Sequence, residues 1–173
     1  MELENKILSR ELQACLYSEG KTLGTAESCT GGRIAEAIIA VPGASDYFKG
    51  GIVSYTDDVK ERLLHVSAET LQAKTAVSED VAVEMVKGAC EALQCTYAIA
   101  ATGYAGPGGG TAENPVGTIW IAVGNKEKVN TLKLEGDNGR DLNLANATNK
   151  ALRLFLDYYI EENPKKPDEE GDF

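Results

Sequence analysis

The spacing of hydrophobic residues predicts a chain of alternating helices and strands. Across residues 3–18, apolar side chains recur every three or four positions, which is the period of an amphipathic helix. The same spacing predicts further helices at about 32–40, 57–64, 78–93 and 141–160. Short apolar or β-branched runs predict strands at 22–26, 51–56, 96–102, 118–123 and 129–134. The last two strands are close enough in sequence to form a hairpin.

Polar residues at the starts of these segments support the same division. Asp57 or Asp58 can cap one helix, and Ser67 and Ser78 are suited to cap two others, because their side-chain oxygens accept hydrogen bonds from free backbone N–H groups. Helices that alternate with strands, followed by a hairpin, indicate an α/β fold with a mixed, partly parallel sheet. Residues 1–160 contain no repeat and no linker, so we expect them to form a single domain.

The C-terminal segment has a different composition. Residues 161–173, "EENPKKPDEEGDF", carry six acidic side chains and two lysines and have no apolar periodicity. Such a segment cannot bury enough apolar surface to offset the entropy of ordering it. We therefore expect an acidic tail that is disordered from about residue 163 onward.

Composition and charge exclude several classes of protein. Hydrophobic residues make up 43% of the 173 positions and charged residues 25%, and no apolar run has the roughly 18 residues that a membrane helix needs. A net charge of −10 argues against nonspecific nucleic-acid binding, which depends on lysine and arginine. The charged start "MELENKILSR" lacks a signal-peptide core, so we expect a cytoplasmic protein that binds neither membranes nor nucleic acids.

The metal-binding residue types are few and scattered. The four cysteines, Cys15, Cys29, Cys90 and Cys95, form no C-x-x-C pair, and His65 is the single histidine. A structural zinc site normally needs four such ligands at close spacing. We therefore expect neither a metal nor a cofactor, and reduced thiols fit the cytoplasm.

The stretch "TAESCTGGRIAEAI", residues 25–38, combines hydroxyls, a thiol and two glycines between a predicted strand and a predicted helix. One interpretation is a simple helix cap, because a hydroxyl satisfies the first N–H groups and glycine permits the turn. The other is a nucleophile or an anion-binding corner, because a helix N-terminus offers free donors and positive dipole together.

Two more corners of this kind follow predicted strands, at about 55–60 and 102–110. If these strands and 22–26 are parallel neighbours, all three corners meet at the edge of the sheet where open α/β folds bind ligands. Helix capping does not require the glycine-rich loop "GYAGPGGG", and loops of that length are usually functional or disordered. This convergence favours a binding or catalytic site.

Within these corners, Ser28 is a candidate nucleophile, and a serine hydroxyl needs a base. His65 lies beyond a predicted helix with nothing nearby to orient it, which leaves Lys60 in the first turn of that helix. The positive helix end and burial would both disfavour its ammonium form. Two alternatives stay open: Lys60 is an ordinary solvated lysine, or Cys29 replaces Ser28 as the nucleophile.

Arginines could hold an anionic ligand near these corners. Guanidinium groups match the geometry of phosphate oxygens, so Arg33 and Arg140 are candidate phosphate contacts. Each could equally be a surface charge.

Four motifs in order resemble the CinA carboxy-terminal domain family: "TAESCTGG", "VPGASDYFKGGIVSYTDDVKERLL", "AVSEDVAVEMVKGA" and "ATGYAGPGGGTAENPVGTIWIAV". The resemblance runs from about residue 4 to 158. It implies a three-layer α/β/α sandwich that is usually a homodimer. It also implies hydrolysis of the carboxamide of nicotinamide mononucleotide, a small pyridine nucleotide, to nicotinate mononucleotide and ammonia.

The resemblance also assigns roles to individual residues. The family's nucleophilic serine falls on Ser28 and its general-base lysine on Lys60. Its tyrosine in the second strand falls on Tyr55 and its threonine before G-x-A-G-P on Thr102, and both would position the substrate or the dyad. The remaining candidate substrate-binding residues lie in or near these motifs: Thr30, Gly31, Gly32, Arg33, Gly103, Gly106 and Arg140.

The tetrahedral intermediate of amide hydrolysis carries a negative oxygen that needs preorganised donors. The backbone N–H groups of Thr30, Gly31 and Gly32 are candidates, because they lie at the predicted start of a helix.

The sequence departs from the family pattern at three positions. Asn114 stands where a basic residue is usual, Leu144 where a second arginine is usual, and Tyr104 where the family is usually aliphatic. Fewer basic groups favour a noncatalytic nucleotide-binding or interaction module, whereas the complete set of Ser28 and Lys60 with their companions favours the enzyme. Hydrolysis of another small amide is a third possibility, which differs only in the pocket.

Overall fold

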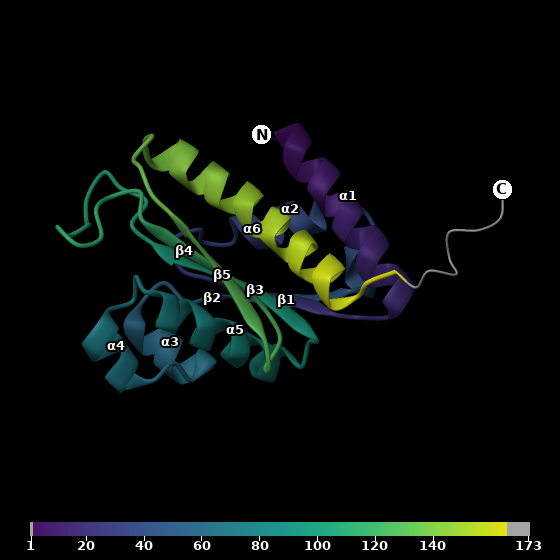
Figure 1. Ribbon diagram of the computed structural model, residues 1–173, viewed down its shortest axis with the longest axis horizontal. Helices are drawn as coiled ribbons and strands as arrows, with labels where there is room; N and C mark the ends of the chain where they lie inside the picture. The colour runs from purple at the N-terminus through teal and green to yellow at the C-terminus, as the bar shows by residue number, and fades with distance from the viewer. Residues whose placement is uncertain (1, 166–173) are drawn as a thin grey trace.

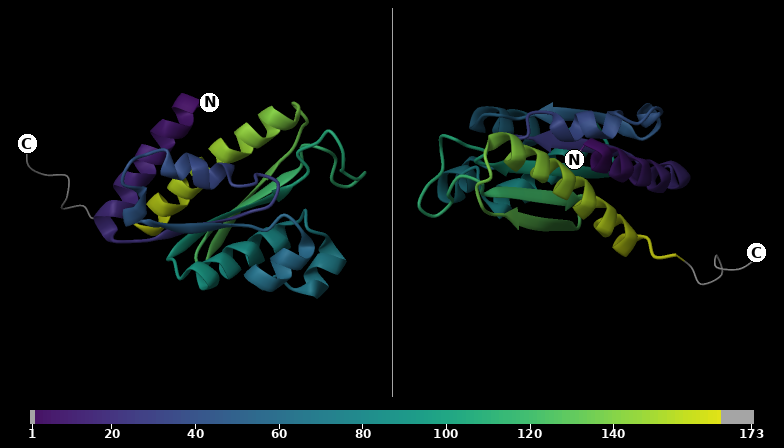
Figure 2. Two further views of the ribbon diagram at one scale, coloured as in Figure 1. Left: turned by 180° about the vertical axis from the view of Figure 1, so that it is seen from behind. Right: turned by 90° about the horizontal axis from the view of Figure 1, so that it is seen from above.

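A five-stranded sheet lies between two layers of helices in the computed structural model, which describes residues 2–165 (Figure 1). One face of the sheet carries α1 (Glu2–Glu19), α2 (Arg33–Ile39) and α6 (Arg140–Glu162). The other face carries α3 (Asp57–Leu64), α4 (Ala68–Lys74) and α5 (Glu79–Leu93). The further views show α1 and α6 side by side on their face (Figure 2). The predicted three-layer α/β/α sandwich is confirmed.

The sheet is mixed, as the sequence predicts. Its strands are β1 (Leu23–Glu27), β2 (Phe48–Val53), β3 (Tyr97–Gly103), β4 (Ile119–Gly124) and β5 (Val129–Leu134). They lie in the order β2-β1-β3-β4-β5, with β1 parallel to β2 and β3, and β3, β4 and β5 antiparallel. The carboxyl ends of the three parallel strands therefore meet at one edge.

Two apolar cores hold the layers together, one on each face of the sheet. The first packs α1, α2 and α6 against the sheet, and the second packs α3, α4 and α5 against it. Every residue of β1 is buried, and all of β3 is buried except its last residue, so both strands are covered by helices on two sides. This burial on both faces explains why neither strand shows a regular alternation of apolar and polar residues.

Strand β2 is displaced from its predicted position. The expected strand was 51–56, but the observed strand begins three residues earlier and ends at Val53. Val53 is paired with Glu27, the last residue of β1, so the chain has no parallel neighbour beyond that point. Tyr55 therefore lies in the loop that leads into α3.

Gly88 sets the position of α3. A Cβ atom at this residue of α5 would collide with the carbonyl oxygen of Leu64, at the end of α3. Glycine thus lets the two helix backbones come into direct contact, which larger residues would prevent.

The predicted serine caps are also confirmed, because Ser67 accepts from the N–H of Thr70 and Ser78 from that of Val81.

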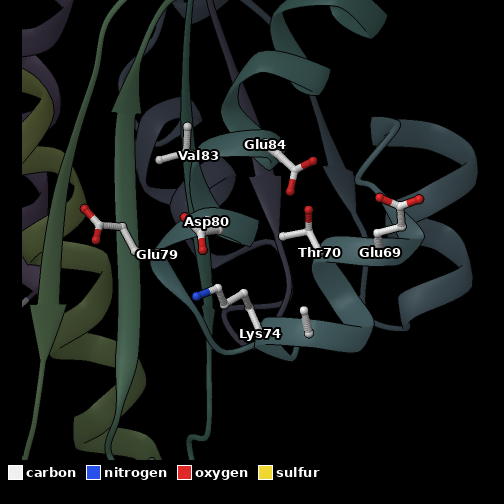
Figure 3. A pocket seen from close by; sticks show the side chains of 8 residues that line it. Glu69, Thr70, Lys74, Glu79, Asp80, Val83 and Glu84 are labelled. Atoms are coloured by element: carbon white, nitrogen blue, oxygen red, sulfur yellow. The ribbon is translucent and has the colours of Figure 1, made fainter.

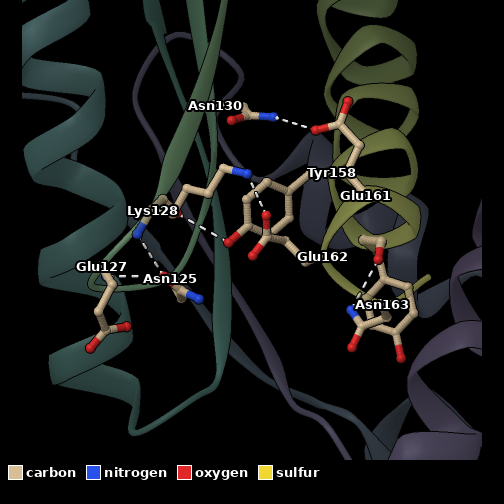
Figure 4. A network of polar contacts seen from close by, with 9 residues as sticks. Asn125, Glu127, Lys128, Asn130, Tyr158, Glu161, Glu162 and Asn163 are labelled. Carbon is tan, nitrogen blue, oxygen red and sulfur yellow. Dashed lines mark hydrogen bonds and ion pairs between the residues drawn. The ribbon is translucent and has the colours of Figure 1, made fainter.

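Polar contacts tie the end of α6 to the predicted β4–β5 hairpin (Figure 4). The Tyr158 hydroxyl donates to the carbonyl of Lys128, whose side chain pairs with Glu162. Helix α6 ends at Glu162, two residues beyond residue 160, where the sequence predicted its end. Residues 166–173, most of the predicted acidic tail, lie outside the described residues.

Candidate active site

A cavity of 250 Å³ opens at the sheet edge where the parallel strands end. Most of the residues assigned from sequence line it: Ser28, Tyr55, Lys60, Thr102, Gly103, Gly106 and Arg140. They come from the ends of β1 and β3, the loop before α3, α3 itself, the glycine-rich loop and the start of α6. The structure thus brings together the three corners that the sequence analysis expected to meet.

Ser28 and Lys60 are in direct contact although 32 residues separate them. The Lys60 Nζ donates to Ser28 Oγ at 2.9 Å and to the carbonyl oxygen of Ser54 at 2.8 Å. Lys60 has an exposed fraction of 1% and Ser28 of 8%. This burial rules out the alternative in which Lys60 is a solvated helix lysine.

Backbone hydrogen bonds fix the two residues relative to each other. The Ser28 N–H donates to the Ala101 carbonyl at 2.9 Å, which extends the β1–β3 pairing by one residue. The Ser54 N–H donates to the Glu27 carbonyl at 2.9 Å, and the Ser54 carbonyl then receives the Lys60 amine. The serine and the lysine are therefore held by the same strand ends.

Burial lowers the pKa of Lys60, whereas the negative charge of Asp57 acts in the opposite direction. Burial is the largest of these influences because the ammonium form loses its hydration. A lysine with a lowered pKa holds a larger share of neutral amine near physiological pH. Lys60 can then accept the Ser28 hydroxyl proton across the 2.9 Å contact.

The two competing residues fit these roles poorly. Cys29 is buried, and burial raises the pKa of its thiol to about 12, so it holds little thiolate at neutral pH. His65 is exposed in left-handed conformation (φ 54°) just after α3 and does not line the cavity. Among the described residues, Ser28 and Lys60 form the best matched nucleophile and base.

Tyr55 and Thr102 occupy different environments within the cavity. Thr102 is buried, and its hydroxyl donates to the carbonyl of Ala76 at 2.9 Å, which ties the segment after α4 to the end of β3. Tyr55 is 59% exposed and presents its ring at the cavity wall. Thr102 therefore shapes the cavity from within, and Tyr55 is free to contact a ligand.

The glycine-rich loop is fixed to the start of α6 by two side chains. The Arg140 guanidinium donates to the Gly106 carbonyl at 2.7 Å, and the buried Asn143 donates to the Ala105 carbonyl at 3.0 Å. Arg140 is itself exposed, so its remaining N–H groups face solvent at the cavity. The sequence analysis missed Asn143, and nothing in its local pattern distinguishes it from an ordinary helix asparagine.

The N-terminus of α2 is already occupied by the protein's own carboxylate. Glu27 is buried (1% exposed), and its two oxygens accept from the N–H groups of Ile34 at 2.8 Å and Ala35 at 3.1 Å. Sequence reasoning missed Glu27, although a carboxylate directly before the "SCTGG" corner was the available signal. The predicted anion-binding corner exists, and its anion is Glu27.

This arrangement corrects part of the predicted binding set. The residues Thr30, Gly31, Gly32 and Arg33 do not line the cavity. The Gly31 N–H donates to the Ser28 carbonyl at 3.1 Å, and Arg33 folds back so that its guanidinium donates to the Thr30 carbonyl. The turn into α2 uses the Gly31 N–H and the Arg33 guanidinium, and the N–H groups of Ile34 and Ala35 go to Glu27.

A larger cavity, of 690 Å³, lies between α4 and α5 (Figure 3). Four carboxylates line it, those of Glu69, Glu79, Asp80 and Glu84, with Lys74 beside them. It contains no pairing of a nucleophile with a base, so its size does not make it the active site.

Across residues 2–165, no group of three or more His, Cys, Asp or Glu side chains is arranged to hold a metal ion.

The model of the CinA C-terminal domain family matches residues 5–159, nearly the whole described chain. The chain belongs to the CinA C-terminal domain family. It is 39% identical to the nicotinamide-nucleotide amidohydrolase PncC of Escherichia coli K12, over 89% of this chain and 94% of that protein. It is 44% identical to a CinA-like protein of Amoebophilus asiaticus, of which it spans 31%. The chain thus spans about a third or less of the length of several longer CinA-like relatives.

Solved structures of the CinA family have the same fold. A competence/damage-inducible protein from Agrobacterium tumefaciens superposes with a TM-score of 0.85 at 37% identity, covering 87% of this chain and 93% of that one. A CinA superfamily protein from Klebsiella pneumoniae gives a TM-score of 0.86 at 32% identity, covering 91% and 98%.

Proposed function

We propose that this protein is an amidohydrolase that converts nicotinamide mononucleotide to nicotinate mononucleotide and ammonia through Ser28 and Lys60. The observation that carries the proposal is the 2.9 Å contact between the Ser28 hydroxyl and a buried lysine with a lowered pKa. The similarity to PncC across 94% of that protein's length supports the substrate.

The reaction begins when Lys60 accepts the Ser28 proton and the serine oxygen attacks the carboxamide carbon. The protonated lysine then gives its proton to the amide nitrogen, the carbon–nitrogen bond breaks, and ammonia leaves. An ester of Ser28 with the nicotinate mononucleotide remains. Lys60, neutral again, takes a proton from water, whose hydroxide attacks the ester, and the serine oxygen leaves with that proton.

The oxyanion of each tetrahedral intermediate needs donors that the fold has not already used. The N–H groups of Cys29, Ala105 and Gly106 are in residues that line the cavity, and none has a hydrogen-bond acceptor among the described residues. We propose these groups in place of Thr30, Gly31 and Gly32. The exposed cation of Arg140 at the same cavity is the proposed phosphate contact.

A noncatalytic nucleotide-binding module remains the alternative, because Asn114 and Leu144 supply no cation. Asn114 is held in the loop, since its backbone N–H donates to the Thr111 hydroxyl oxygen at 2.9 Å, and Leu144 is fully buried. Neither supplies a positive charge, so Arg140 would be the one exposed cation at the cavity, among the described residues, for a phosphate.

Ammonia release decides between the two functions. Purified protein is supplied with nicotinamide mononucleotide, and ammonia is followed with a coupled dehydrogenase, with Ser28→Ala as the matched control. The enzyme releases ammonia, and the Ser28→Ala variant binds the nucleotide without releasing any. Binding without ammonia release by the unaltered protein would support the noncatalytic module instead.

We also propose a cytoplasmic homodimer as the working state. No helix within residues 2–165 has the length and apolar character needed to span a bilayer. Strand β2 is an edge of the sheet, and Val53 and Tyr55 leave apolar surface exposed at and just after its end. Sedimentation at micromolar concentration measures the assembly state directly.

A further inference from the structure

Asp57 is a cavity residue whose charge has no counterpart in the fold. It lies in the first turn of α3, three residues before Lys60, and it lines the cavity together with Ser28. Among the described residues, its carboxylate takes part in no hydrogen bond and no ion pair. The N-cap of α3 is Thr56 and neither Asp57 nor Asp58 caps the helix, contrary to the sequence-based expectation. Asp58 instead accepts from the Thr56 hydroxyl at 2.6 Å and pairs with Arg62.

This carboxylate opposes the proposed chemistry of the free enzyme. A negative charge beside Lys60 favours the ammonium form, which cannot act as a base. The dipole of α3 favours a negative charge in its first turn, but this carboxylate also lines the cavity, where a positively charged ligand would compensate it. Nicotinamide mononucleotide carries such a charge on its pyridinium ring, directly bonded to the carboxamide that Ser28 would attack.

The surrounding cavity wall also suits a cation. Tyr55 and Tyr104 line the same cavity, and aromatic faces attract cations at distances up to about 6 Å. Tyr104 packs against the backbone of Gly109 in the glycine-rich loop. The one exposed cation of the cavity among the described residues, Arg140, comes from α6, on the opposite face of the sheet from α3. The wall therefore offers an anion and a cation from separate elements, which matches a ligand with a positive ring and a negative phosphate.

We propose that Asp57 determines specificity by selecting a positively charged pyridinium ring over a neutral ring of the same shape. This inference rests on the proposed function for the identity of the nucleotide. A bound pyridinium compensates the carboxylate and at the same time disfavours the proton on Lys60, so the charged substrate helps to activate the base. A neutral ring does neither.

The test compares nicotinamide mononucleotide with its reduced form, which keeps the phosphate and the carboxamide but has a neutral dihydropyridine ring. Binding of both is measured by calorimetry on Ser28→Ala protein, so that no turnover interferes. Asp57→Asn in this background is expected to weaken binding of the oxidised nucleotide about tenfold and to leave the reduced one within about twofold, an effect of the size expected for a partly exposed charge pair. The matched control Asp58→Asn removes the neighbouring carboxylate outside the cavity and is expected to change neither.

Equal weakening of both nucleotides by Asp57→Asn, or no weakening of either, would overturn the inference, and so would a failure of the Ser28→Ala protein to bind the oxidised nucleotide. Ammonia release by the unaltered protein is measured in parallel. Turnover without ring selectivity leaves the proposed function standing and rejects the role of Asp57. Selectivity at Asp57 without turnover supports that role and rejects the proposed hydrolysis.

Discussion

At the scale of single residues, the site depends on keeping a lysine amine out of water. Lys60 has two hydrogen-bond partners, the Ser28 hydroxyl and the Ser54 carbonyl, and neither carries a charge. Burial without a neutralising partner therefore lowers the pKa of Lys60. This unfavourable burial of the ammonium form leaves more of the Lys60 amine unprotonated, and so able to accept a proton, at moderate pH.

Replacing Lys60 by methionine should separate catalysis from folding. Methionine fills a similar volume without a proton acceptor, so we expect turnover to fall by about a hundredfold or more, the range for losing a general base. Lys60→Arg is the control, because it keeps a cation that cannot release its proton, and it should be equally inactive. Ammonia release by folded protein is the measurement, and substantial activity in either variant would rule out Lys60 as the base.

The pH dependence of the free energy of unfolding should also reflect the lowered pKa of Lys60. Below the lowered pKa of folded Lys60, both the folded and the unfolded chain hold the proton, so the full cost of burying an ammonium is present. As the pH rises toward the ordinary value of 10.5, the folded state has released its proton and the unfolded state follows, so this cost disappears.

The melting temperature of Lys60→Met relative to the unaltered protein should therefore be highest near pH 6 and should decline toward pH 10. Thermal unfolding at several pH values measures it. A difference that is constant across this range would mean that folding does not perturb the lysine.

At the scale of elements, the corner between β1 and α2 is organised by Glu27. Its carboxylate accepts two N–H groups at the start of α2 and its carbonyl accepts the Ser54 N–H, so one residue joins β1, α2 and the segment that holds Lys60. A carboxylate at a helix N-terminus is favoured by both hydrogen bonding and the helix dipole.

Glu27→Gln keeps the shape and removes the charge, and its amide group turns a donor toward one of the helix N–H groups. We expect it to lower the free energy of unfolding by about 1.5–3 kcal/mol, the range for hydrogen bonds to a charged group. Glu36→Gln, at an exposed position of the same helix, is the matched control and should change stability little. Chemical denaturation compares the two variants, and equal effects would contradict the assigned role.

Gly31 is needed for the turn rather than for the oxyanion. Its φ of 56° lies in the left-handed region, its N–H is already bonded to the Ser28 carbonyl, and a Cβ would meet nothing closer than 3.9 Å. We expect Gly31→Ala to cost about 1 kcal/mol of stability, the penalty for a left-handed alanine. Turnover per folded molecule should stay within about twofold, and a hundredfold loss would restore Gly31 as an oxyanion donor.

At the scale of the whole molecule, the two helical layers bring residues from distant parts of the chain to one sheet edge. The layer of α3 and α5 supplies the base, the layer of α2 and α6 supplies the exposed arginine, and the sheet between them supplies the serine. Every chemical group that the proposed reaction needs comes from ordinary side chains and backbone.

Activity should therefore survive chelation. The described residues contain no group of His, Cys, Asp and Glu side chains suited to a metal, and the dyad activates its own nucleophile. Ammonia release is measured before and after treatment with EDTA and dialysis. Loss of turnover that a divalent ion restores would require a different mechanism.

The sequence by itself determined the elements, because helix and strand periods and serine caps act over a few neighbouring residues. It placed α1 and the β4–β5 hairpin within one or two residues, and its motifs pointed to Ser28 and Lys60. The sequence could not determine where β2 ends or that Glu27 occupies the N-terminus of α2. It also could not determine that burial keeps the Cys29 thiol protonated.

Each of these features depends on residues brought together from separate segments. Strand β2 ends where its partner β1 ends, and the Cys29 thiol loses its acidity because the first core closes over it. Hydrogen bonds and desolvation between distant segments exist only after the chain has packed. The tertiary structure therefore decided which polar groups remain free to act on a substrate.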